Sequence, residues 1–443
     1  MDLLLRGGTV VTFDPDDRVV QGDVLVREGR IIAVGAPPAA ARLTRVVDAR
    51  GCAVIPGFVQ AHVHLCQTLF RGMADDLPLL PWLRDRIWPL EAAHDAESLR
   101  ASADLGLCEL IQGGTTTVLD MGTVRHHDVV FEALRDSGIR AFSGKAMMDA
   151  PDTWPGLRES TASSLSVSDA LCDRWHGAEG GRLRYAYAPR FILSCTEGLF
   201  RQCAERARAR GALLHTHAAE HAGERDAVRA LLGRDDVDAL RDWGFAGRDV
   251  VIAHGVQLTP AQRRRMAADG TRVTHCPSAN LKLGSGVAKV ARMLSAGVAV
   301  ALGADGAPCN NNLDALVEMR RAALLAKRLG DTSALPARRV LRLATLDGAR
   351  ALGIDDLVGS IEVGKRADLA VIRLDGAHVE PGGDVFSRVV YAAQSRDVRH
   401  VFVEGRALLR DGELTTLDAP RVLASARGHA LKVAARAGVP AHG

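Results

Sequence analysis

Histidines and carboxylates recur in this sequence at the ends of short apolar runs. Four such runs end as QAHVHL, LLHTHAAE, VIAHG and ALGAD. Residues two apart on an extended chain project to the same side, so His62 and His64 can share one ion. Imidazole nitrogens and a carboxylate oxygen are ligands that Zn²⁺ accepts, and a catalytic site keeps one position open for water. We therefore predict one divalent metal ion per chain, zinc in the first place and iron as the alternative, held by His62, His64, His217 and Asp305.

Two further residues fit the acid and base roles that hydrolysis requires. Glu220 follows His217 by three residues, close enough to reach a substrate but displaced from the ligand position. His254 can hydrogen-bond the attacking water or the tetrahedral oxygen that develops. Asp305 can accept the proton of the activated water. The alternatives are a solvated loop carboxylate for Glu220 and a core histidine for His254.

These residues together predict a deamination. Glu220 would protonate a ring nitrogen next to the carbon under attack, which makes an aromatic C=N bond electrophilic. The resulting tetrahedral carbon would carry OH and NH₂, and ammonia would leave. We expect the catalytic set to be Glu220, His254 and Asp305.

A (β/α)₈ barrel is the fold that would bring these run ends together. Between residues 57 and 356, strand-like runs alternate with helical patterns that end in glycine. Barrel enzymes place their catalytic groups at the C-terminal ends of the strands. The strands are predicted at 53–58, 115–120, 140–146, 183–189, 212–217, 250–255, 272–276 and 298–305.

The two ends of the chain have a different, β-rich texture. Residues 1–56 and 357–443 contain short alternating runs broken by Gly and Asp, which predict one small β-sandwich domain built from both termini. The tail after about 419 is rich in Ala and Arg. The predicted domains are therefore this composite β domain and a barrel over 57–356.

Composition excludes several classes of protein. The 443 residues are 47% hydrophobic and 25% charged, with 56 basic and 53 acidic side chains and a net charge of +3. Neither a basic patch for nucleic acid nor an apolar run of about 20 residues for a membrane is present. The eight cysteines contain no CxxC pair, so we expect small buried hydrophobes. We expect a cytoplasmic enzyme with a small-molecule heterocyclic substrate.

The motifs resemble those of the amidohydrolase superfamily. The similar segments are PGFVQAHVHL, HTHAAE, AHG, HCPSANLKLGSG and LGADGAPCNNNLD, and the resemblance extends over essentially the whole chain. Within this superfamily, the motifs resemble more narrowly the aminohydrolases that act on purines, nucleosides and s-triazines. The resemblance implies the same metal ligands and acid/base residues as above, and a homodimer or homotetramer.

Two segments bear on the substrate and point in different directions. Residues 69–91 resemble deaminases of S-adenosylhomocysteine, methylthioadenosine and 5′-deoxyadenosine, which implies that Trp82 packs near the substrate and that Glu91 binds ribose hydroxyls. The run Pro189-Arg190-Phe191 instead resembles guanine deaminase, in which the Arg donates hydrogen bonds to the base. We predict a 5′-modified adenine nucleoside, with guanine, a pterin or an s-triazine as alternatives.

Two other functions and the remaining residues complete the prediction. A two-metal cyclic amidase would need a carboxylated lysine at the end of the fourth strand, which ends YAYAPRF without one. Lys145 ends the third strand, is a more distant candidate for that ligand, and is grouped here with the substrate-binding residues. A scaffold without catalysis is disfavoured by the complete set of ligands. Structural roles are expected for His215 and His275.

Overall fold

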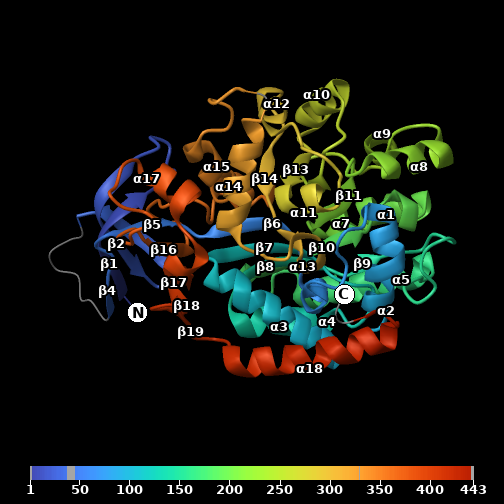
Figure 1. The fold of residues 1–443 in the computed structure, drawn as a ribbon, viewed down its shortest axis with the longest axis horizontal. Coiled ribbons are helices and arrows are strands. Elements are labelled where there is room, and N and C mark those ends of the chain that lie inside the picture. Colours follow the sequence, from blue (N-terminus) through green and yellow to red (C-terminus); the bar gives the residue numbers. More distant parts are fainter. Residues whose placement is uncertain (1, 37–44, 329, 441–443) are drawn as a thin grey trace.

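The computed structural model describes residues 2–36, 45–328 and 330–440, which form a barrel with a β domain beside it (Figure 1). Eight parallel strands make the barrel, with two short continuations. In chain order they are β6 (Phe58–His64), β7 (Thr115–Met121), β8 (Arg140–Gly144), β9 (Ala146–Met147), β10 (Leu183–Pro189), β11 (Leu213–Ala218), β12 (Val250–His254), β13 (Arg272–His275), β14 (Val300–Leu302) and β15 (Asp305–Gly306).

The ring closes through its last strand. β14 pairs with β13, and β15, three residues further on, pairs with β6. Gly303 lies between them so close to β6 that a Cβ atom there would stand 2.6 Å from the carbonyl oxygen of His62. The closure therefore brings Asp305 beside the strand that carries the two paired histidines.

Helices follow the strands as in a β/α repeat, so the predicted barrel is confirmed. α7, for example, begins where the hydroxyl of Thr196 accepts from the N–H of Leu199 and ends at Gly211, whose φ of 65° is left-handed. The helices of this region are α1 (Leu79–Trp82), α2 (Trp88–Ala92), α3 (Ala96–Gln112), α4 (Asp128–Ser137), α5 (Thr161–Trp175), α6 (Ala178–Gly181), α7 (Glu197–Arg210), α8 (Ala222–Leu232), α9 (Asp236–Asp242), α10 (Pro260–Asp269), α11 (Pro277–Lys282), α12 (Val290–Ser295), α13 (Ala307–Asn310), α14 (Ala315–Ala326), α15 (Ala337–Leu343) and α16 (Leu346–Ala351).

Strands from both termini form the second sheet, as expected. Its hydrogen-bonded order is β19-β18-β17-β16-β5-β1-β2-β3, with β4 on β1. The members are β1 (Asp2–Val11), β2 (Val19–Arg27), β3 (Arg30–Gly35), β4 (Arg45–Asp48), β5 (Cys52–Pro56), β16 (Leu369–Arg373), β17 (Val398–Val403), β18 (Arg406–Arg410) and β19 (Glu413–Leu414), and α17 (Val385–Ser387) lies between β16 and β17.

The predicted first barrel strand, 53–58, is wrong. Residues 52–56 are β5, which pairs with β1 and β16 in the terminal sheet, and the first barrel strand begins only at Phe58. The break is Gly57, where a Cβ atom would lie 2.1 Å from the side chain of Thr116. Both strands are buried throughout, and the apolar residues of β5 run on into Phe58 and Val59, so periodicity could not separate them. His62 and His64 consequently lie within the strand and not after it.

The C-terminal helix α18 (Ala419–Ala437) packs on helices of the barrel. It runs along α3 and also contacts α2 (Figure 1). The division at residues 56 and 357 remains a prediction, and this helix shows that the last part of the chain returns to the barrel side.

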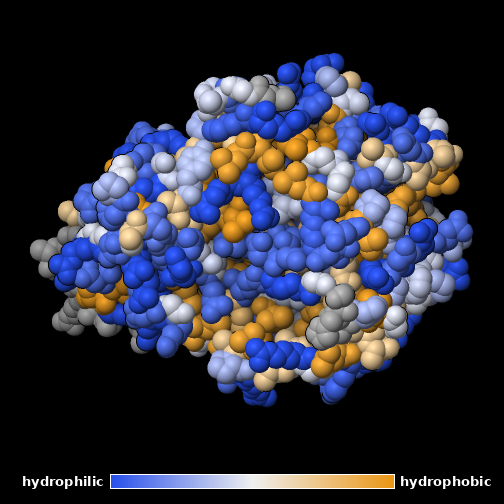
Figure 2. All heavy atoms as spheres, viewed as in Figure 1, coloured by the Kyte–Doolittle hydropathy of each residue, from blue (hydrophilic) through white to orange (hydrophobic). Residues whose placement is uncertain are grey.

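Burial agrees with the composition. All eight cysteines are buried and free, as predicted. Hydrophilic side chains cover most of the face drawn in Figure 2, with separate hydrophobic areas between them. Among the helices of the described residues, none is both long and apolar enough to cross a membrane.

A buried ion pair joins the two parts of the fold. Arg140 of β8 donates to Asp368 at 2.8 and 3.3 Å and to Glu404 at 3.1 Å, and Asp368 also accepts from the N–H of Glu404. The side chains of Arg140 and Asp368 are 4% and 2% exposed. A buried charge left without its partner is costly, so this pair holds the barrel to the terminal sheet.

We expect Asp368→Asn to lower the free energy of unfolding by about 2 to 3 kcal/mol, because it removes the more buried of the two carboxylates that pair with Arg140 and leaves only Glu404. Unfolding in urea measures this loss. The control is Asp375→Asn, because Asp375 makes an exposed pair with Arg373, and pairs of that kind contribute about 1 kcal/mol or less. Equal stability of the two variants would contradict the assignment.

Candidate active site

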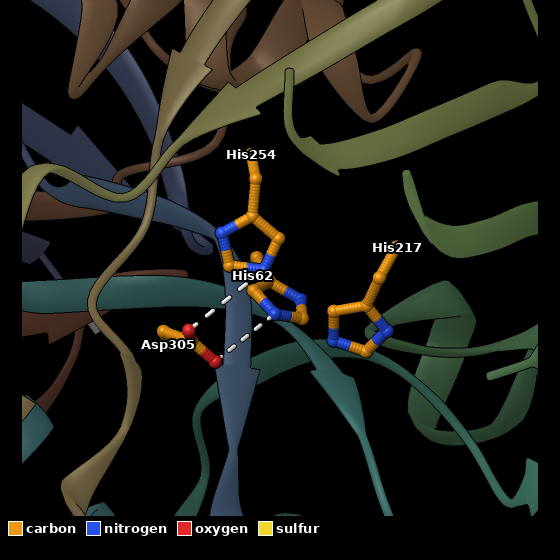
Figure 3. A group of neighbouring side chains, drawn as sticks. All are labelled: His62, His217, His254 and Asp305. Carbon is orange, nitrogen blue, oxygen red and sulfur yellow. Dashed lines mark ion pairs between the residues drawn. The ribbon is translucent and has the colours of Figure 1, made fainter. Parts of the chain in front are cut away.

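Three imidazoles and a carboxylate converge at the C-terminal end of the barrel. Ligand atoms of His62, His217, His254 and Asp305 all lie within 4.8 Å of one another (Figure 3). They come from β6, β11, β12 and β15, four different strands. His64 joins them, because its Nε2 lies 3.1 Å from Nε2 of His217 and 3.3 Å from Oδ1 of Asp305.

Hydrogen bonds from the backbone fix which nitrogen faces the centre. Nδ1 of His64 lies 2.7 Å from the carbonyl oxygen of Met121, and Nδ1 of His217 lies 2.8 Å from that of Arg190. A carbonyl oxygen can only accept, so both Nδ1 atoms carry the proton. Both Nε2 atoms therefore present a lone pair to the centre, as a metal ligand must.

His62 is oriented in the same way through His215. Nδ1 of His215 donates to the carbonyl oxygen of Val251 at 2.9 Å, so its Nε2 can accept from Nδ1 of His62 at 2.8 Å. Nε2 of His62 then carries a lone pair, is fully buried, and has no hydrogen-bond partner in the described structure. A buried nitrogen with this orphaned lone pair, 3.2 Å from Oδ1 of Asp305, fits a divalent metal ion.

Burial keeps His64, His217 and His254 neutral. It lowers the pKa of His64 to about 3 and that of His254 to about 4, and it places the pKa of His217 well below its ordinary value. Burial acts to raise the pKa of Asp305, but the neighbouring imidazoles, His62 first, hold it well below the ordinary value. The cluster thus offers neutral nitrogens and an ionised carboxylate near neutral pH.

Glu220 lies next to this cluster as a buried carboxyl group whose surroundings favour its protonated form. Burial raises its pKa well above the ordinary value, and the charges of Glu224 and Asp305 add to the effect. Its Oε2 lies 3.4 Å from Nε2 of His254, and its Oε1 is buried without a partner among the described residues. A carboxyl group that keeps its proton and faces a cavity can donate it to a substrate.

The backbone at two of these residues is strained. His254 has a φ of 77° and Asp305 a φ of 63°, both in the left-handed region that residues other than glycine seldom adopt. Such conformations cost of the order of 1 to 3 kcal/mol each and persist only where the surroundings hold them. Nδ1 of His254 is held by Oδ1 of Asn280 at 2.9 Å.

These residues form the floor of a partly open pocket, in which the side chains leave only about 20 Å³ free. The walls are mostly apolar and the polar groups gather at the metal end. The lining residues are His64, Gln67, Leu79, Trp82, Leu83, Arg190, Phe191, His217, Glu220, His254, Leu283 and Asp305.

Glu91 and Arg190, predicted as two separate substrate contacts, bond to each other. Nη1 and Nη2 of Arg190 donate to the two carboxylate oxygens of Glu91 at 2.6 and 3.1 Å, and Nε2 of Gln67 donates at 2.8 Å. Both members of the pair are buried. Arg190 lines the cavity whereas Glu91 lies behind it, so the expected direct exposure of Glu91 to a substrate is absent.

Of the other two predicted contacts, Trp82 lines the cavity and Lys145 does not. The indole N–H of Trp82 is buried without an acceptor in the described structure. Lys145 is fully buried, 2.5 Å from Oε2 of Glu159 and 3.2 Å from the hydroxyl of Ser164. It lies between β8 and β9, where the strand is interrupted, which turns its side chain toward α5. Its assignment to the substrate pocket is corrected accordingly.

Sequence reasoning missed Gln67 and Asn280. Gln67 follows His64 by three residues, lines the cavity and bonds to Glu91. Asn280 fixes His254 and belongs to the HCPSAN run. Each stands directly after a barrel strand, which was the signal available. His275, expected to be structural, is buried and is not among the lining residues.

A barrel with histidines and a carboxylate convergent at the C-terminal ends of its strands is the arrangement of a metal-dependent hydrolase. The model of the amidohydrolase family matches residues 53–408, and the chain belongs to that family. With its deaminase relatives, this makes it a hydrolase of carbon–nitrogen bonds in cyclic compounds.

Similar proteins cover nearly the whole chain. The 5-methylthioadenosine/S-adenosylhomocysteine deaminase of Moorella thermoacetica is 40% identical over 426 residues, 95% of this chain and 97% of that protein. The 5′-deoxyadenosine deaminase of Methanosarcina acetivorans is 37% identical over 438 residues, 98% and 99% of the two chains. A zinc-bound adenosine deaminase from Xanthomonas campestris superposes with a TM-score of 0.92 at 35% identity, covering 98% of this chain and 99% of that one.

The distances indicate different roles for His64, the expected metal ligand, and His254, the expected acid/base residue. Because Nε2 of His254 lies 3.9 Å from Asp305 and 3.4 Å from Glu220, it faces the acid more closely than the centre of the cluster. We expect His64→Ala to lose most of its bound metal, whereas His254→Ala keeps about one equivalent and loses activity. Elemental analysis of both variants measures this. If His254→Ala lost the metal and His64→Ala kept it, His254 would be the metal ligand and His64 would not.

Proposed function

We propose that this protein is a hydrolytic deaminase that releases ammonia from a 5′-modified adenine nucleoside, with one metal ion held by His62, His64, His217 and Asp305. The observation that carries the proposal is the buried Glu220 carboxyl, which lies 3.4 Å from His254 and lines the same pocket as the His and Asp cluster, and whose pKa is raised by that burial. The adenosine deaminase of similar structure has bound zinc, which supports zinc as the ion.

A divalent ion at this cluster would supply the Lewis acidity that makes water a nucleophile near neutral pH. Asp305, ionised and 3.2 Å from His62, would accept the proton that the water gives up. Glu220 would donate its proton to a ring nitrogen, which leaves the adjacent carbon electron-poor. His254, whose Nδ1 donates to Asn280, has a lone pair on Nε2 and would accept a hydrogen bond from the O–H group of the tetrahedral carbon. The amine would take the proton held by Asp305 and leave as ammonia, while the hydroxyl proton returns to Glu220.

The lining suits a planar ring with a bulky tail. Trp82, Phe191 and Leu283 form apolar walls, and the indole N–H of Trp82 and the free donors of Arg190 lie ready for acceptor atoms of the substrate. The names of the relatives, deaminases of methylthioadenosine, S-adenosylhomocysteine and 5′-deoxyadenosine, support a nucleoside. For Glu91 to receive ribose hydroxyls, they must share oxygens that now accept from Arg190 and Gln67.

The Glu91–Arg190 pair also supports a second candidate, a guanine-type base. With both oxygens of Glu91 occupied, Arg190 is the cationic group in the lining of the cavity, and its donors match a carbonyl or ring nitrogen of an oxo-heterocycle. A pterin or s-triazine would use the same donors. The cytoplasmic location and the homodimer or homotetramer predicted from the sequence also remain proposals.

Glu220→Gln should keep the metal and lose activity by about 10² to 10⁴, the usual contribution of a general acid or base, because an amide cannot deliver the proton. Ammonia release and metal content are measured on the same preparation. The control is Glu97→Gln, a carboxylate of similar length in α3 that does not line the cavity. Near-normal turnover of Glu220→Gln would remove this residue from the mechanism.

A substrate panel decides between the two pockets. We expect the wild type to deaminate 5′-deoxyadenosine or S-adenosylhomocysteine faster than guanine. Glu91→Gln should raise KM for the nucleosides about tenfold or more, since it removes a charged hydrogen-bond acceptor while keeping the shape. Much faster turnover of guanine, together with an unchanged KM in Glu91→Gln, would favour the guanine-type pocket.

A further inference from the structure

Glu318 is a buried carboxylate outside the cavity whose contacts lead back to the active site. It lies on α14, is 1% exposed and does not line the cavity. Its Oε1 accepts from Nδ2 of Asn310 at 3.1 Å and from the hydroxyl of Ser278 in a shorter bond, and its Oε2 accepts from the N–H of Ser278 at 3.1 Å. Three donors on two loops therefore converge on one carboxylate.

One of the two loops follows β13 and carries Asn280, which orients the ring of His254. Ser278 lies on α11, two residues before Asn280, whose Oδ1 accepts from Nδ1 of His254. His254 needs this support, because its φ of 77° is strained and its ring must face Glu220. Holding Ser278 thus holds the group that orients His254.

The other loop follows β15 and holds the backbone next to Asp305. Asn310 on α13 donates through Nδ2 to the carbonyl oxygen of Ala304 at 2.7 Å as well as to Glu318. Both acceptors lie on the same side, so the orientation of the amide is fixed. Ala304 is the immediate neighbour of Asp305, which has the second strained φ of the site, 63°.

We propose that Glu318 is a positioning residue for the reaction, which ties the loops after β13 and β15 together so that His254 and Asp305 keep their places across the reacting carbon. α11, α13 and α14 lie together at this side of the barrel (Figure 1). Lys282 joins the same two loops at their rim through the carbonyl oxygen of Pro308 at 2.9 Å. Glu318 joins the two loops nearer their bases, through Ser278 and Asn310. The inference rests on the proposed function, which gives His254 and Asp305 their roles.

Glu318→Gln tests the proposal, because an amide has the same shape but cannot accept from all three donors. We expect kcat to fall about 10- to 100-fold, with KM within about threefold and the metal retained, since a displaced catalytic group costs rate more than binding. Steady-state kinetics use the best substrate of the panel above. The control is Asp368→Asn, which removes an equally buried carboxylate far from the site and should lower stability without lowering kcat.

A double-mutant cycle separates positioning from a general loss of structure. If Glu318 acts partly through Asn280, then Glu318→Gln in an Asn280→Ala background should cost clearly less kcat than it does in the wild type, a coupling that contacts between neighbours produce. Asp368→Asn should leave kcat unchanged in the Asn280→Ala background as well. A Glu318→Gln variant with kcat within about twofold of wild type, or effects that multiply fully with Asn280→Ala, would overturn the proposal.

Two smaller changes keep the test open should Glu318→Gln fail to fold. Ser278→Ala and Asn310→Ala each remove a donor to Glu318, and each should lower kcat several-fold while the metal stays bound. Wild-type kcat in both would overturn the proposal. Failure of the wild type to release ammonia from any compound of the panel would overturn the proposed function itself, whereas an active wild type with unchanged variants overturns the positioning role alone.

Discussion

The structure depends on presenting several imidazole lone pairs to one point in a space from which water is largely excluded. The imidazoles must first be neutral, and burial keeps those of His64 and His217 neutral. Their lone pairs must also lie on Nε2. The carbonyl oxygens of Met121 and Arg190, and His215 behind His62, accept hydrogen bonds from Nδ1 and so hold the protons there. Without these acceptors the rings could bury either nitrogen, and no ion would find a consistent set of ligands.

The barrel strands bring the active-site residues to one rim, and side chains of the loops after the strands orient them. Parallel strands bring residues hundreds of positions apart to one rim, as β15 does when it pairs with β6. The strained backbone of His254 and Asp305 shows that strand geometry alone does not aim these side chains. Side-chain ties behind the loops, through Asn280, Asn310 and Glu318, offset that strain, and a reaction that moves protons between fixed groups benefits from such rigidity.

Much of this could be predicted from the sequence, because strand ends and their polar residues are local signals. Seven of the barrel strands and the histidines of the HTHAAE run fall where the pattern placed them. The boundary between β5 and β6 was not predicted. The apolar residues run on from β5 into the start of β6, and the chain changes sheet at Gly57, where Thr116 packs closely. The pairing of Glu91 with Arg190, 99 residues apart, depends on which side chains the closed barrel brings together. The direction of Lys145 depends on a strand interruption, and no sequence pattern reports either.

The central claim is that one metal ion at this cluster enables a deamination, and a metal titration tests it most directly. Metal-free protein, prepared with a chelator, would be titrated with Zn²⁺ while ammonia release from the best nucleoside substrate is followed. The account predicts no turnover without metal and a linear rise that levels off at about one equivalent per chain. Turnover that persists without metal, or that rises until two equivalents are bound, would contradict it.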